Sequence, residues 1–395
     1  MGRLAREAYI IGVGMTPFGK FPQKTFADLA REASWLALED AGVDARRVEA
    51  VYCGNAVEGL LSGQEDIRGQ VAMRETGLAG KPIVNTPNAC ASSSTALREA
   101  WLAVASGLYD LVLAVGFEKL FVNDTARTTR ALASCTDVAV EGNLGVFFPG
   151  LYAMEARRYM HETGATREQF ARVSVKNHRN GFHNPKAQIR KIVTVEEVLA
   201  SRVVADPITL YMCSPIGDGG AAAVVCSQAL ADRLGAGSRA VHIAAIGMAS
   251  GGYQDLMIDE PRPTSTVMAA AEAYEISGLG PKDVDLMEIH GAFSPAELKF
   301  FEELGFAGPG GALRFLEDGD TEITGRLPVN ASGGLESKGH PVGATGLAMV
   351  YEVVNQLRGR AGPRQVNAPR VGLVHNGGGV IGGDNAVMCV HILKK

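Results

Sequence analysis

The sequence predicts an α/β protein made of two similar halves, with a separate segment inserted into the first half. Short apolar runs of strand length alternate with amphipathic helical patterns, which is typical of mixed α/β layers. A stretch near residue 37 is repeated near residue 273, which favours a duplication. The length of 395 residues, with 46% hydrophobic and 21% charged residues, indicates a globular protein and excludes a disordered chain.

In the first half, strands and helices are expected to alternate. The helical pattern that starts near residue 25 stops at Gly42, and the one that starts near residue 91 stops at Gly107. Glycine readily adopts the left-handed conformation that ends a helix. The expected strands are 9–13, 48–53, 83–85 and 111–115, and the expected helices are 25–41 and 91–106.

The second half repeats this pattern at a constant offset of 236 residues. Gly14, between Val13 and Met15, also has a counterpart in Gly247, between Ile246 and Met248. We expect a strand at 284–289, a helix at 347–357 and a strand at 371–374. The identical pairs are Ala37/Ala273, Glu39/Glu275, Gly42/Gly278, Val48/Val284 and Ala56/Ala292.

We therefore divide the chain into a first half (1–118 and 216–239), an insertion (119–215) and a second half (240–395). Between residues 155 and 202 the insertion carries ten Lys or Arg against five Asp or Glu, whereas the whole chain has a net charge of −5. This basic segment either attracts an anionic ligand or is an ordinary solvated helical surface. The negative net charge argues against a general nucleic-acid-binding protein.

Several classes of protein are excluded by what the sequence lacks. The six cysteines include no C-x-x-C pair, and no H-E-x-x-H, P-loop or well-placed G-x-G-x-x-G occurs, so metal, ATP and NAD find no support. No apolar run approaches 18 residues, and the run at 8–11 is too short for the core of a signal peptide. We expect a soluble cytoplasmic protein with free thiols and no membrane contact.

The first segment that carries chemistry reads N-A-C-A-S-S-S from Asn88 to Ser94, between an expected strand and an expected helix. A cysteine at a helix N-terminus lies at the positive end of the helix dipole, which favours its nucleophilic thiolate. Small neighbours would let a substrate approach Cys90. On this segment alone, a buried structural thiol is an equally open interpretation.

The second segment reads G-H-P-V-G-A-T-G from Gly339 to Gly346 and precedes an apolar helical pattern. A histidine in a glycine-rich turn ahead of a helix can act as a general base, or it can be a capping or core residue. Cys90 and His340 are 250 residues apart, and the same offset relates Thr95 to Thr345. The two residues thus occupy similar points of the two halves, and packing of the halves could bring them together.

Two further histidines end expected strands. His290 begins H-G-A-F after the strand 284–289, and His375 begins H-N-G-G-G after the strand 371–374. The glycines after His375 could present backbone N–H groups to an oxyanion. Taken singly, either histidine is more often a structural residue than a catalytic one.

In this order, the segments resemble those of the thiolase family over nearly the full chain. The element Gly339–Gly346 is the most specific, and D-G-G-A-A-A from Asp218 resembles the turn that leads a family strand. The resemblance implies two βαβαβαββ halves in five layers, αβαβα, and a loop domain that holds coenzyme A. It also implies that basic residues of the insertion, such as Arg179, Lys186 and Arg190, contact the phosphates of CoA.

The resemblance further implies a role for each motif residue. Cys90 would take the acyl group of a 3-oxoacyl-CoA, and His340 would deprotonate Cys90 and help stabilise the enolate oxygen. The backbone N–H groups of Cys90 and Gly377 would hold the oxyanion. The sequence departs from the family where Gly291 replaces a usual Asp and where no second acid/base cysteine stands. The second proton carrier is therefore expected either to be a histidine, His290 first and His375 second, or to be absent.

These features predict a thiolase that cleaves a 3-oxoacyl-CoA with CoA or runs the reverse Claisen condensation. CoA is then a substrate, and no metal or redox cofactor is implied. The two alternatives are a ketosynthase-like condensing enzyme, against which G-H-P rather than G-H-T argues, and a weakly catalytic CoA-binding subunit of a multienzyme complex.

The resemblance also concerns partners and substrates. A homodimer or higher oligomer is expected. Relatives of this branch pair with a small zinc-ribbon/OB-fold acyl-CoA-binding protein in mevalonate synthesis, steroid side-chain breakdown and benzoylsuccinyl-CoA cleavage. The sequence does not distinguish acetoacetyl-CoA from these larger substrates, and it does not fix the direction of the reaction.

Overall fold

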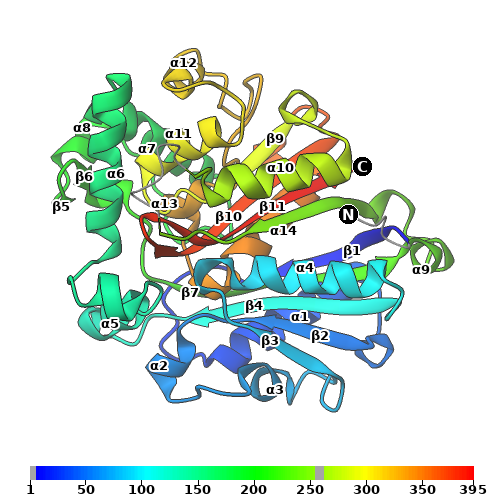
Figure 1. The fold of residues 1–395 in the computed structure, drawn as a ribbon. Coiled ribbons are helices and arrows are strands. Elements are labelled where there is room, and N and C mark those ends of the chain that lie inside the picture. Colours follow the sequence, from blue (N-terminus) through cyan, green and yellow to red (C-terminus); the bar gives the residue numbers. More distant parts are fainter. Residues whose placement is uncertain (1–5, 254–261) are drawn as a thin grey trace.

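The computed structural model describes residues 6–253 and 262–395. In this part of the chain, nine strands form one mixed sheet in the order β3-β2-β4-β7-β1-β8-β11-β10-β9 (Figure 1). The five strands on one side belong to the first half of the chain and the four on the other side to the second half. The two parts meet where β1 pairs with β8 over only two residue pairs. The duplicated α/β fold predicted from the sequence is confirmed.

The first half follows the expected alternation of strands and helices. Its last strand returns antiparallel between β4 and β1, whereas β3, β2 and β4 run parallel. The elements are β1 (Ala8–Met15), α1 (Phe26–Ala41), β2 (Ala50–Gly54), α2 (Glu58–Ser62), α3 (Arg68–Met73), β3 (Ile83–Thr86), α4 (Ser92–Ala105), β4 (Leu111–Lys119), β7 (Asp218–Ser227) and α9 (Gln228–Arg233).

The second half repeats this order with one strand reduced. The counterpart of β3 is only a single parallel bridge between Met287 and Val329, so this half has four strands. The elements are β8 (Val241–Ala249), α10 (Ser265–Ser277), β9 (Leu286–Ile289), α11 (Ser294–Glu303), α12 (Gly311–Glu317), α13 (Gly334–Lys338), α14 (Thr345–Leu357), β10 (Val371–Ile381) and β11 (Asp384–Lys394).

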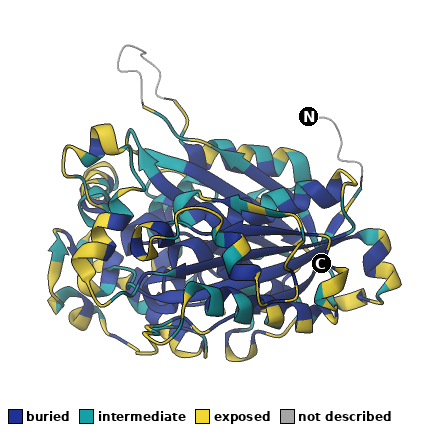
Figure 2. Cartoon of the chain, turned by 90° about the horizontal axis from the view of Figure 1, so that it is seen from below, coloured by how far each residue is buried: buried dark blue, intermediate teal, exposed yellow. Residues whose placement is uncertain are grey.

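Five layers result from the way in which the helices cover the two parts of the sheet. Helix α1 packs on β1, β7 and β4 from outside, and α10 packs on β8 and β11 from the opposite outer side. Helices α4 and α14 pack against each other between the two parts (Figure 1). Figure 2 shows that the buried residues gather in the interior of the molecule, and most residues of the inner helices α4 and α14 are buried. The N-termini of the two inner helices therefore meet in the middle of the molecule.

Repeated glycines explain why the outer helices sit alike in both halves. An added Cβ at Gly14 would lie 2.4 Å from the carbonyl oxygen of Ala33 in α1, and one at Gly247 would lie 2.1 Å from that of Ala269 in α10. Only glycine permits such a close approach of strand and helix. The repeat found in the sequence therefore reflects a repeated packing contact.

Residues 119–215 form a group of helices beside the second half of the sheet. Helix α7 packs against α11 and α13, which couples this segment to the region around β9. None of the helices in the described residues is long and apolar enough to cross a membrane. The elements are α5 (Thr125–Ala133), α6 (Phe148–Thr163), α7 (Arg167–Phe182), α8 (Val195–Ala200), β5 (Val203–Ala205) and β6 (Ile208–Thr209).

Candidate active site

Cys90 lies in the tight turn that leads from β3 into α4. Ala89, immediately before it, has a φ of 47°, a left-handed conformation that is uncommon for a residue with a Cβ. Ser92 holds the turn, because its hydroxyl donates to the carbonyl of Ala89 (2.6 Å) and accepts the N–H of Asn88 (2.9 Å). The strained turn places Cys90 just ahead of the first turn of α4.

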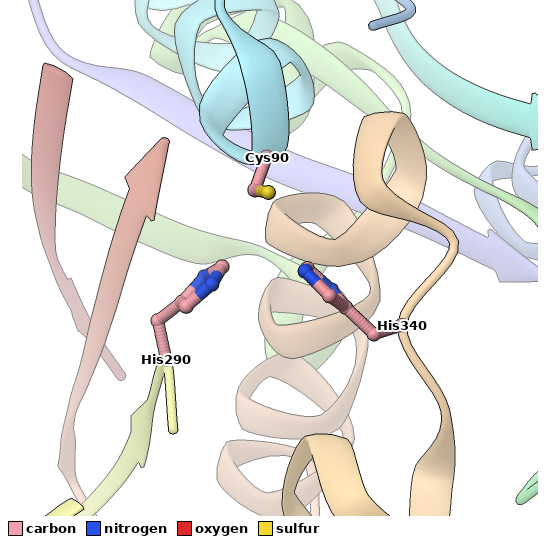
Figure 3. A group of neighbouring side chains, drawn as sticks. All are labelled: Cys90, His290 and His340. Atoms are coloured by element: carbon pink, nitrogen blue, oxygen red, sulfur yellow. The ribbon is translucent and has the colours of Figure 1, made fainter. Parts of the chain in front are cut away.

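Two histidines lie beside Cys90 (Figure 3). His290 follows the end of β9, and His340 lies in the loop between α13 and α14. One donor atom of each of the three side chains lies within 4.8 Å of the others. The imidazole rings are 4.9 Å apart between centroids and nearly perpendicular, at 88°. Residues separated by up to 250 positions thus form one cluster, as the offset between Cys90 and His340 predicted.

The hydrogen bonds of His340 fix which of its nitrogens carries the proton. Its Nδ1 lies 2.7 Å from the hydroxyl oxygen of Thr345. That hydroxyl donates its only proton to the carbonyl of Pro341 (3.0 Å), so it accepts a hydrogen bond from Nδ1–H. The Nε2 of neutral His340 is therefore unprotonated and can accept a proton.

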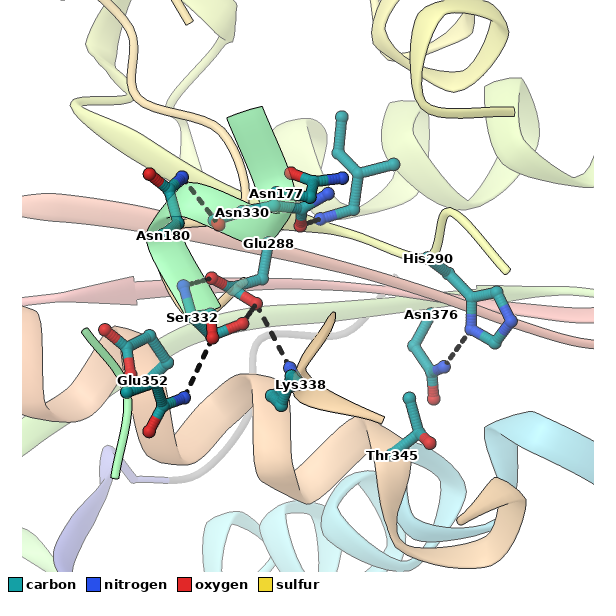
Figure 4. Close-up of polar contacts among 12 residues, drawn as sticks. Asn177, Asn180, Glu288, His290, Asn330, Ser332, Lys338, Thr345, Glu352 and Asn376 are labelled. Carbon is teal, nitrogen blue, oxygen red and sulfur yellow. Dashed lines mark hydrogen bonds and ion pairs between the residues drawn. The ribbon is translucent and has the colours of Figure 1, made fainter. Parts of the chain in front are cut away.

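His290 has the opposite tautomer. The side-chain amide of Asn376, on β10, donates from Nδ2 to Nδ1 of His290 over 2.7 Å (Figure 4). The amide is oriented by Ser94 of α4, whose hydroxyl donates to its Oδ1 over 2.7 Å. Because Nδ1 accepts a hydrogen bond, the proton of neutral His290 lies on Nε2. One histidine of the cluster can thus accept a proton while the other can donate a hydrogen bond.

Both imidazoles are uncharged at neutral pH. Burial lowers the pKa of His290 to about 3, and the ammonium of Lys338 contributes to the shift. Burial also lowers the pKa of His340 well below its usual value, with further contributions from His290 and Lys338. A neutral His340 is the form that a general base requires.

The thiol of Cys90 is also uncharged, contrary to the expectation that the helix N-terminus favours a thiolate. Burial raises its pKa to about 12, and the carboxylate of Glu118 acts in the same direction. Hydrogen bonds from two backbone N–H groups oppose this effect without overcoming it. Desolvation of the charged form outweighs the partial charge of the helix end. The thiol must therefore lose its proton during the reaction, to a neighbouring base.

The two N–H groups beside the thiol are those of Cys90 itself and of Gly379. The sequence pointed instead to Gly377, which lies two residues earlier on β10. A Cβ added at Gly377 would approach Asn385 and Met388 of β11, whereas one added at Gly379 would approach Ala89. Gly379 has a φ of 63°, which turns the backbone at this point and directs its N–H to Cys90.

His375 does not join the cluster. It is fully buried, its Nε2 lies 3.2 Å from the hydroxyl of Thr266, and its ring packs on Phe300 with 4.5 Å between centroids. Strand β10 continues through this segment, so successive side chains point to opposite faces of the sheet. Asn376 therefore faces Cys90 and His290, while His375 faces away.

Asn376 and Thr345 were not singled out from the sequence, and Gly379 was included only among the glycines after His375. The alternation of side chains along a strand could have identified Asn376, had the strand been extended beyond residue 374. The sequence repeat pairs Thr345 with Thr95, but nothing in the sequence connects either residue to a histidine nitrogen.

The three basic residues expected to contact CoA phosphates each have another partner in the structure. Arg179 pairs with Glu322, and the Nζ of Lys186 donates to the carbonyl of Met15. Arg190 donates to the carbonyl of Phe182 over 3.3 Å. Arg179 and Arg190 retain solvent-facing surface, so a bound anion would compete with these contacts.

A buried carboxylate anchors the loop that carries His340. Glu118, at the end of β4, accepts N–H groups from Ala56 (2.9 Å), Val57 (3.1 Å) and Gly343 (2.9 Å). Burial raises its pKa to about 7, while these three hydrogen bonds favour the ionised form. Glu118 thereby ties the His340 loop to the first half of the sheet.

Beside the turn of Cys90 lies a pocket of about 440 Å³. Ala89 and Gly379, which flank the thiol, are among its lining residues, and Met248, Val380 and Ile381 make its wall partly apolar. The structure therefore offers space for a substrate group next to the cysteine.

The same three donor atoms could in principle share a metal ion. However, the Nδ1 of His290 is occupied by Asn376, and its Nε2 carries a proton. The buried ammonium of Lys338, which lowers the pKa of both histidines, also opposes a cation at this point. The cluster is thus better suited to proton transfer than to metal binding.

Comparison with known proteins assigns both halves of the chain to one family. Residues 8–229 match the family model described as "Thiolase, N-terminal domain", and residues 247–394 match "Thiolase C-terminal domain-like".

Individual relatives agree with these matches. The chain is 44% identical to an acetyl-CoA acetyltransferase of Methanothermobacter thermautotrophicus, over 99% of this chain and 100% of that protein. It is 38% identical to the benzoylsuccinyl-CoA thiolase subunit BbsB of Thauera aromatica, over 95% of this chain and 96% of that one. Among solved structures, the Ltp2-ChsH2(DUF35) aldolase matches with a TM-score of 0.82 and 30% identity, covering 99% of this chain and 98% of that one.

Proposed function

The chain belongs to the thiolase family, and from this premise we propose that it transfers an acyl group from a 3-oxoacyl-CoA to CoA through Cys90. The enzyme would also catalyse the reverse condensation. The relatives named as an acetyl-CoA acetyltransferase and as a thiolase subunit support a thiolase-family acyltransferase, whereas the acyl substrate and the residue roles below are our proposal.

The observation that carries this proposal is the pair of opposite histidine tautomers around one thiol. Thiolysis needs a base that takes the proton of the attacking thiol and returns it to the leaving carbon, and a hydrogen-bond donor for the negative charge that forms. His340 has a free Nε2 lone pair and His290 has an Nε2 proton, each fixed by a hydrogen bond on its Nδ1. Both groups lie within reach of Cys90.

In the first half-reaction, Sγ of Cys90 attacks the 3-keto carbon while its proton passes to Nε2 of His340. The oxyanion that forms is placed near the N–H groups of Cys90 and Gly379, which already approach the sulfur. The bond between C2 and C3 then breaks, which leaves an acyl thioester on Cys90 and an acetyl-CoA enolate. His340, now an imidazolium, passes this proton to C2 of the enolate, while the Nε2–H of neutral His290 donates a hydrogen bond that stabilises the enolate.

In the second half-reaction, the thiol of CoA gives its proton to Nε2 of neutral His340 and attacks the thioester carbonyl. Cys90 leaves and takes this proton back from His340. Each histidine thereby returns to its starting tautomer, and no group outside the cluster needs to supply or remove a proton.

The proposal is tested by incubating the purified protein with a panel of 3-oxoacyl-CoAs and measuring intact and peptide mass. The panel should include acetoacetyl-CoA and bulky aryl and steroid-like members, because the relatives include an acetyl-CoA acetyltransferase and a benzoylsuccinyl-CoA thiolase subunit. We expect a mass increase on the peptide that contains Cys90, and its size identifies the acyl group. Cys90→Ala should remove the increase, and full turnover by this variant would refute the assignment.

A second variant tests the base. His340→Ala should lower turnover by about 10²–10⁴-fold, the usual contribution of a positioned acid or base. Turnover near the wild-type rate would remove His340 from the mechanism. Cys90→Ala removes the nucleophile and should abolish acylation. His340→Ala removes the base and should only slow acylation.

A partner-dependent reaction is the second candidate. Two relatives favour it, because BbsB is named as a subunit and the solved aldolase is named with ChsH2(DUF35). We propose that a small zinc-ribbon/OB-fold acyl-CoA-binding protein supplies part of the substrate site in that case. An unmodified protein across the panel, followed by acylation of Cys90 once a candidate partner is added, would favour this arrangement over the isolated enzyme.

A further inference from the structure

A buried ion pair joins the two chain segments that carry the histidines. The Nζ of Lys338 and a carboxylate oxygen of Glu288 are 3.2 Å apart (Figure 4), and the side chains are 1% and 0% exposed. Lys338 ends α13, two residues before His340, and Glu288 lies in β9, two residues before His290. The pair therefore joins the segments that carry the two histidines, at equivalent distances along the chain.

The carboxylate end of the pair is fixed by a third residue. Ser332 donates both its backbone N–H and its hydroxyl to Glu288. Glu288 thus has a defined position in the core. The ammonium of Lys338 can move away only if its buried ion pair with Glu288 breaks. Rotation of the loop that carries His340, relative to β9, would separate the two charges.

Such a pair is costly to bury, so its presence calls for a reason other than stability. Removing two charges from water costs several kcal/mol per ion, and an apolar pair of similar size is often at least as stable. A buried charge pair can instead specify one arrangement of the chain and set the electrostatic potential nearby.

A positive charge adds to the effect of burial on the two histidines. Burial is the largest cause of their lowered pKa values, followed for His340 by His290; Lys338 lowers the pKa of both, and Glu288 does not offset it. Other titratable groups also pack around the two histidines and the ion pair. Cys90 and Glu118 approach from the first half of the sheet, His375 lies on the far face of β10, and Glu352 of α14, paired with Arg364, faces Glu288.

We propose that Lys338, held by Glu288, is a positioning residue that fixes the two imidazoles against each other and, together with their burial, keeps both of them uncharged. This inference rests on the proposed roles of His290 and His340 in the reaction. A protonated His340 could not take the proton of Cys90. A protonated His290 would carry a proton on both ring nitrogens and would lose the hydrogen bond that its Nδ1 accepts from Asn376. Lys338 itself does not touch the substrate in this scheme.

The test compares three variants with the wild type. Lys338→Met removes the charge at similar volume, Lys338→Arg keeps it, and Lys176→Met removes an equally buried lysine whose partner is Glu297 (2.6 Å). Lys176 does not contribute to the pKa of either histidine, so Lys176→Met controls for the loss of a buried ion pair. The pH dependence of kcat and kcat/KM is measured with the best substrate of the panel.

Lys338→Met should lower kcat by about 10–100-fold, because small displacements of catalytic groups have effects of this size. It should change KM much less. The acid limb of kcat/KM should move to higher pH by about one unit, since loss of a nearby positive charge makes each imidazole easier to protonate. Lys338→Arg should restore the position of this limb, and Lys176→Met should leave it unchanged.

A measurement without substrate separates this proposal from the proposed function. In protein labelled with ¹³C-histidine, the ring signals of His290 and His340, assigned from their Gln variants, report protonation directly. These rings should take up protons at higher pH in Lys338→Met than in the wild type, whether or not any acyl-CoA is turned over. Equal titration in two folded proteins would overturn the inference and leave the proposed function untouched.

Lys338→Met leaves Glu288 without its partner and could prevent folding. In that event Lys338→Met/Glu288→Gln, in which neither side chain is charged, is titrated instead. If both rings take up protons at higher pH in the double variant than in the wild type, the role of the lysine charge is supported. If the folded double variant titrates like the wild type, the inference is overturned.

Discussion

Thr345→Val isolates the hydrogen bond that makes His340 a base. Valine has nearly the shape of threonine, so the packing at the start of α14 is kept while the hydroxyl is lost. The wild-type hydroxyl accepts Nδ1–H of His340 at 2.7 Å and donates to Pro341 at 3.0 Å. Both Thr345 and His340 are buried, at 0% and 7% exposure, so water cannot replace the missing acceptor.

The size of the effect follows from the unpaired donor. Leaving a buried N–H without an acceptor costs about 1–3 kcal/mol. In the variant this cost falls on the productive tautomer alone, because the alternative tautomer places the lone pair of Nδ1 against the valine. The population with a free Nε2 lone pair therefore falls, and acylation of Cys90 should slow by about 5- to 150-fold.

The assay is single-turnover acylation, quenched at intervals and followed by mass spectrometry of the Cys90 peptide. Thr345→Ser retains the hydroxyl and should stay within a few-fold of the wild type. The melting temperature of each variant shows whether α14 is intact. If folded Thr345→Val acylates Cys90 within twofold of the wild-type rate, the hydroxyl does not set the tautomer and the reasoning is wrong.

Three further predictions concern other parts of the site and its support. His290→Gln should lower steady-state turnover by about 10²–10⁴-fold, whereas folded His375→Gln should keep most of it; the opposite result would exchange their roles. Alkylation of Cys90 by iodoacetamide should accelerate with pH and reach no plateau below pH 10, because burial raises the thiol pKa to about 12; a plateau near pH 7 would show a stable thiolate. Glu297→Ala, which leaves a buried lysine unpaired, should cost about 3–5 kcal/mol of stability, while Glu162→Ala, on an exposed helix surface, should cost less than about 1 kcal/mol in the same thermal melts.

The parts of the site that could be predicted are those carried by short motifs. Cys90 and His340 each precede a helix in a segment rich in small residues, and the repeat placed them at equivalent points of the two halves. His290 was preferred to His375 by comparison with family motifs, and the structure brings His290 to Cys90 and turns His375 away. Whether these residues act as proposed is for the variants to decide.

Other features of the site could not be predicted, because they depend on how far a strand extends and how deeply a residue is buried. No local sequence pattern encodes these properties. The glycines after His375 suggested a turn, but β10 continues to Ile381, and this decides that Asn376 rather than His375 faces the site. The choice of Gly379 over Gly377 has the same origin. The charge state of Cys90 was also misjudged, because the helix dipole is visible in the sequence whereas the depth of burial is not.

The meeting of the two inner helices explains why the duplicated halves need each other. Gly346, in the first turn of α14, lies so close to α4 that an added Cβ would be 2.2 Å from the hydroxyl oxygen of Ser94. Ser93 of α4 also accepts the N–H of Leu347 over 3.1 Å. Cys90 precedes one of these helix ends and His340 precedes the other, so their separation is set by this contact.

Neither half could form the site alone, because each supplies what the other lacks. The first half provides the thiol, and Ser94 provides the hydroxyl that orients Asn376. The second half provides both histidines together with Asn376, which fixes the tautomer of His290. Two helix N-termini directed at one buried point disfavour a positive imidazolium and favour a negative oxyanion. The contact between the halves thus brings the reacting groups together and supplies an electrostatic environment suited to the anionic intermediates of acyl transfer.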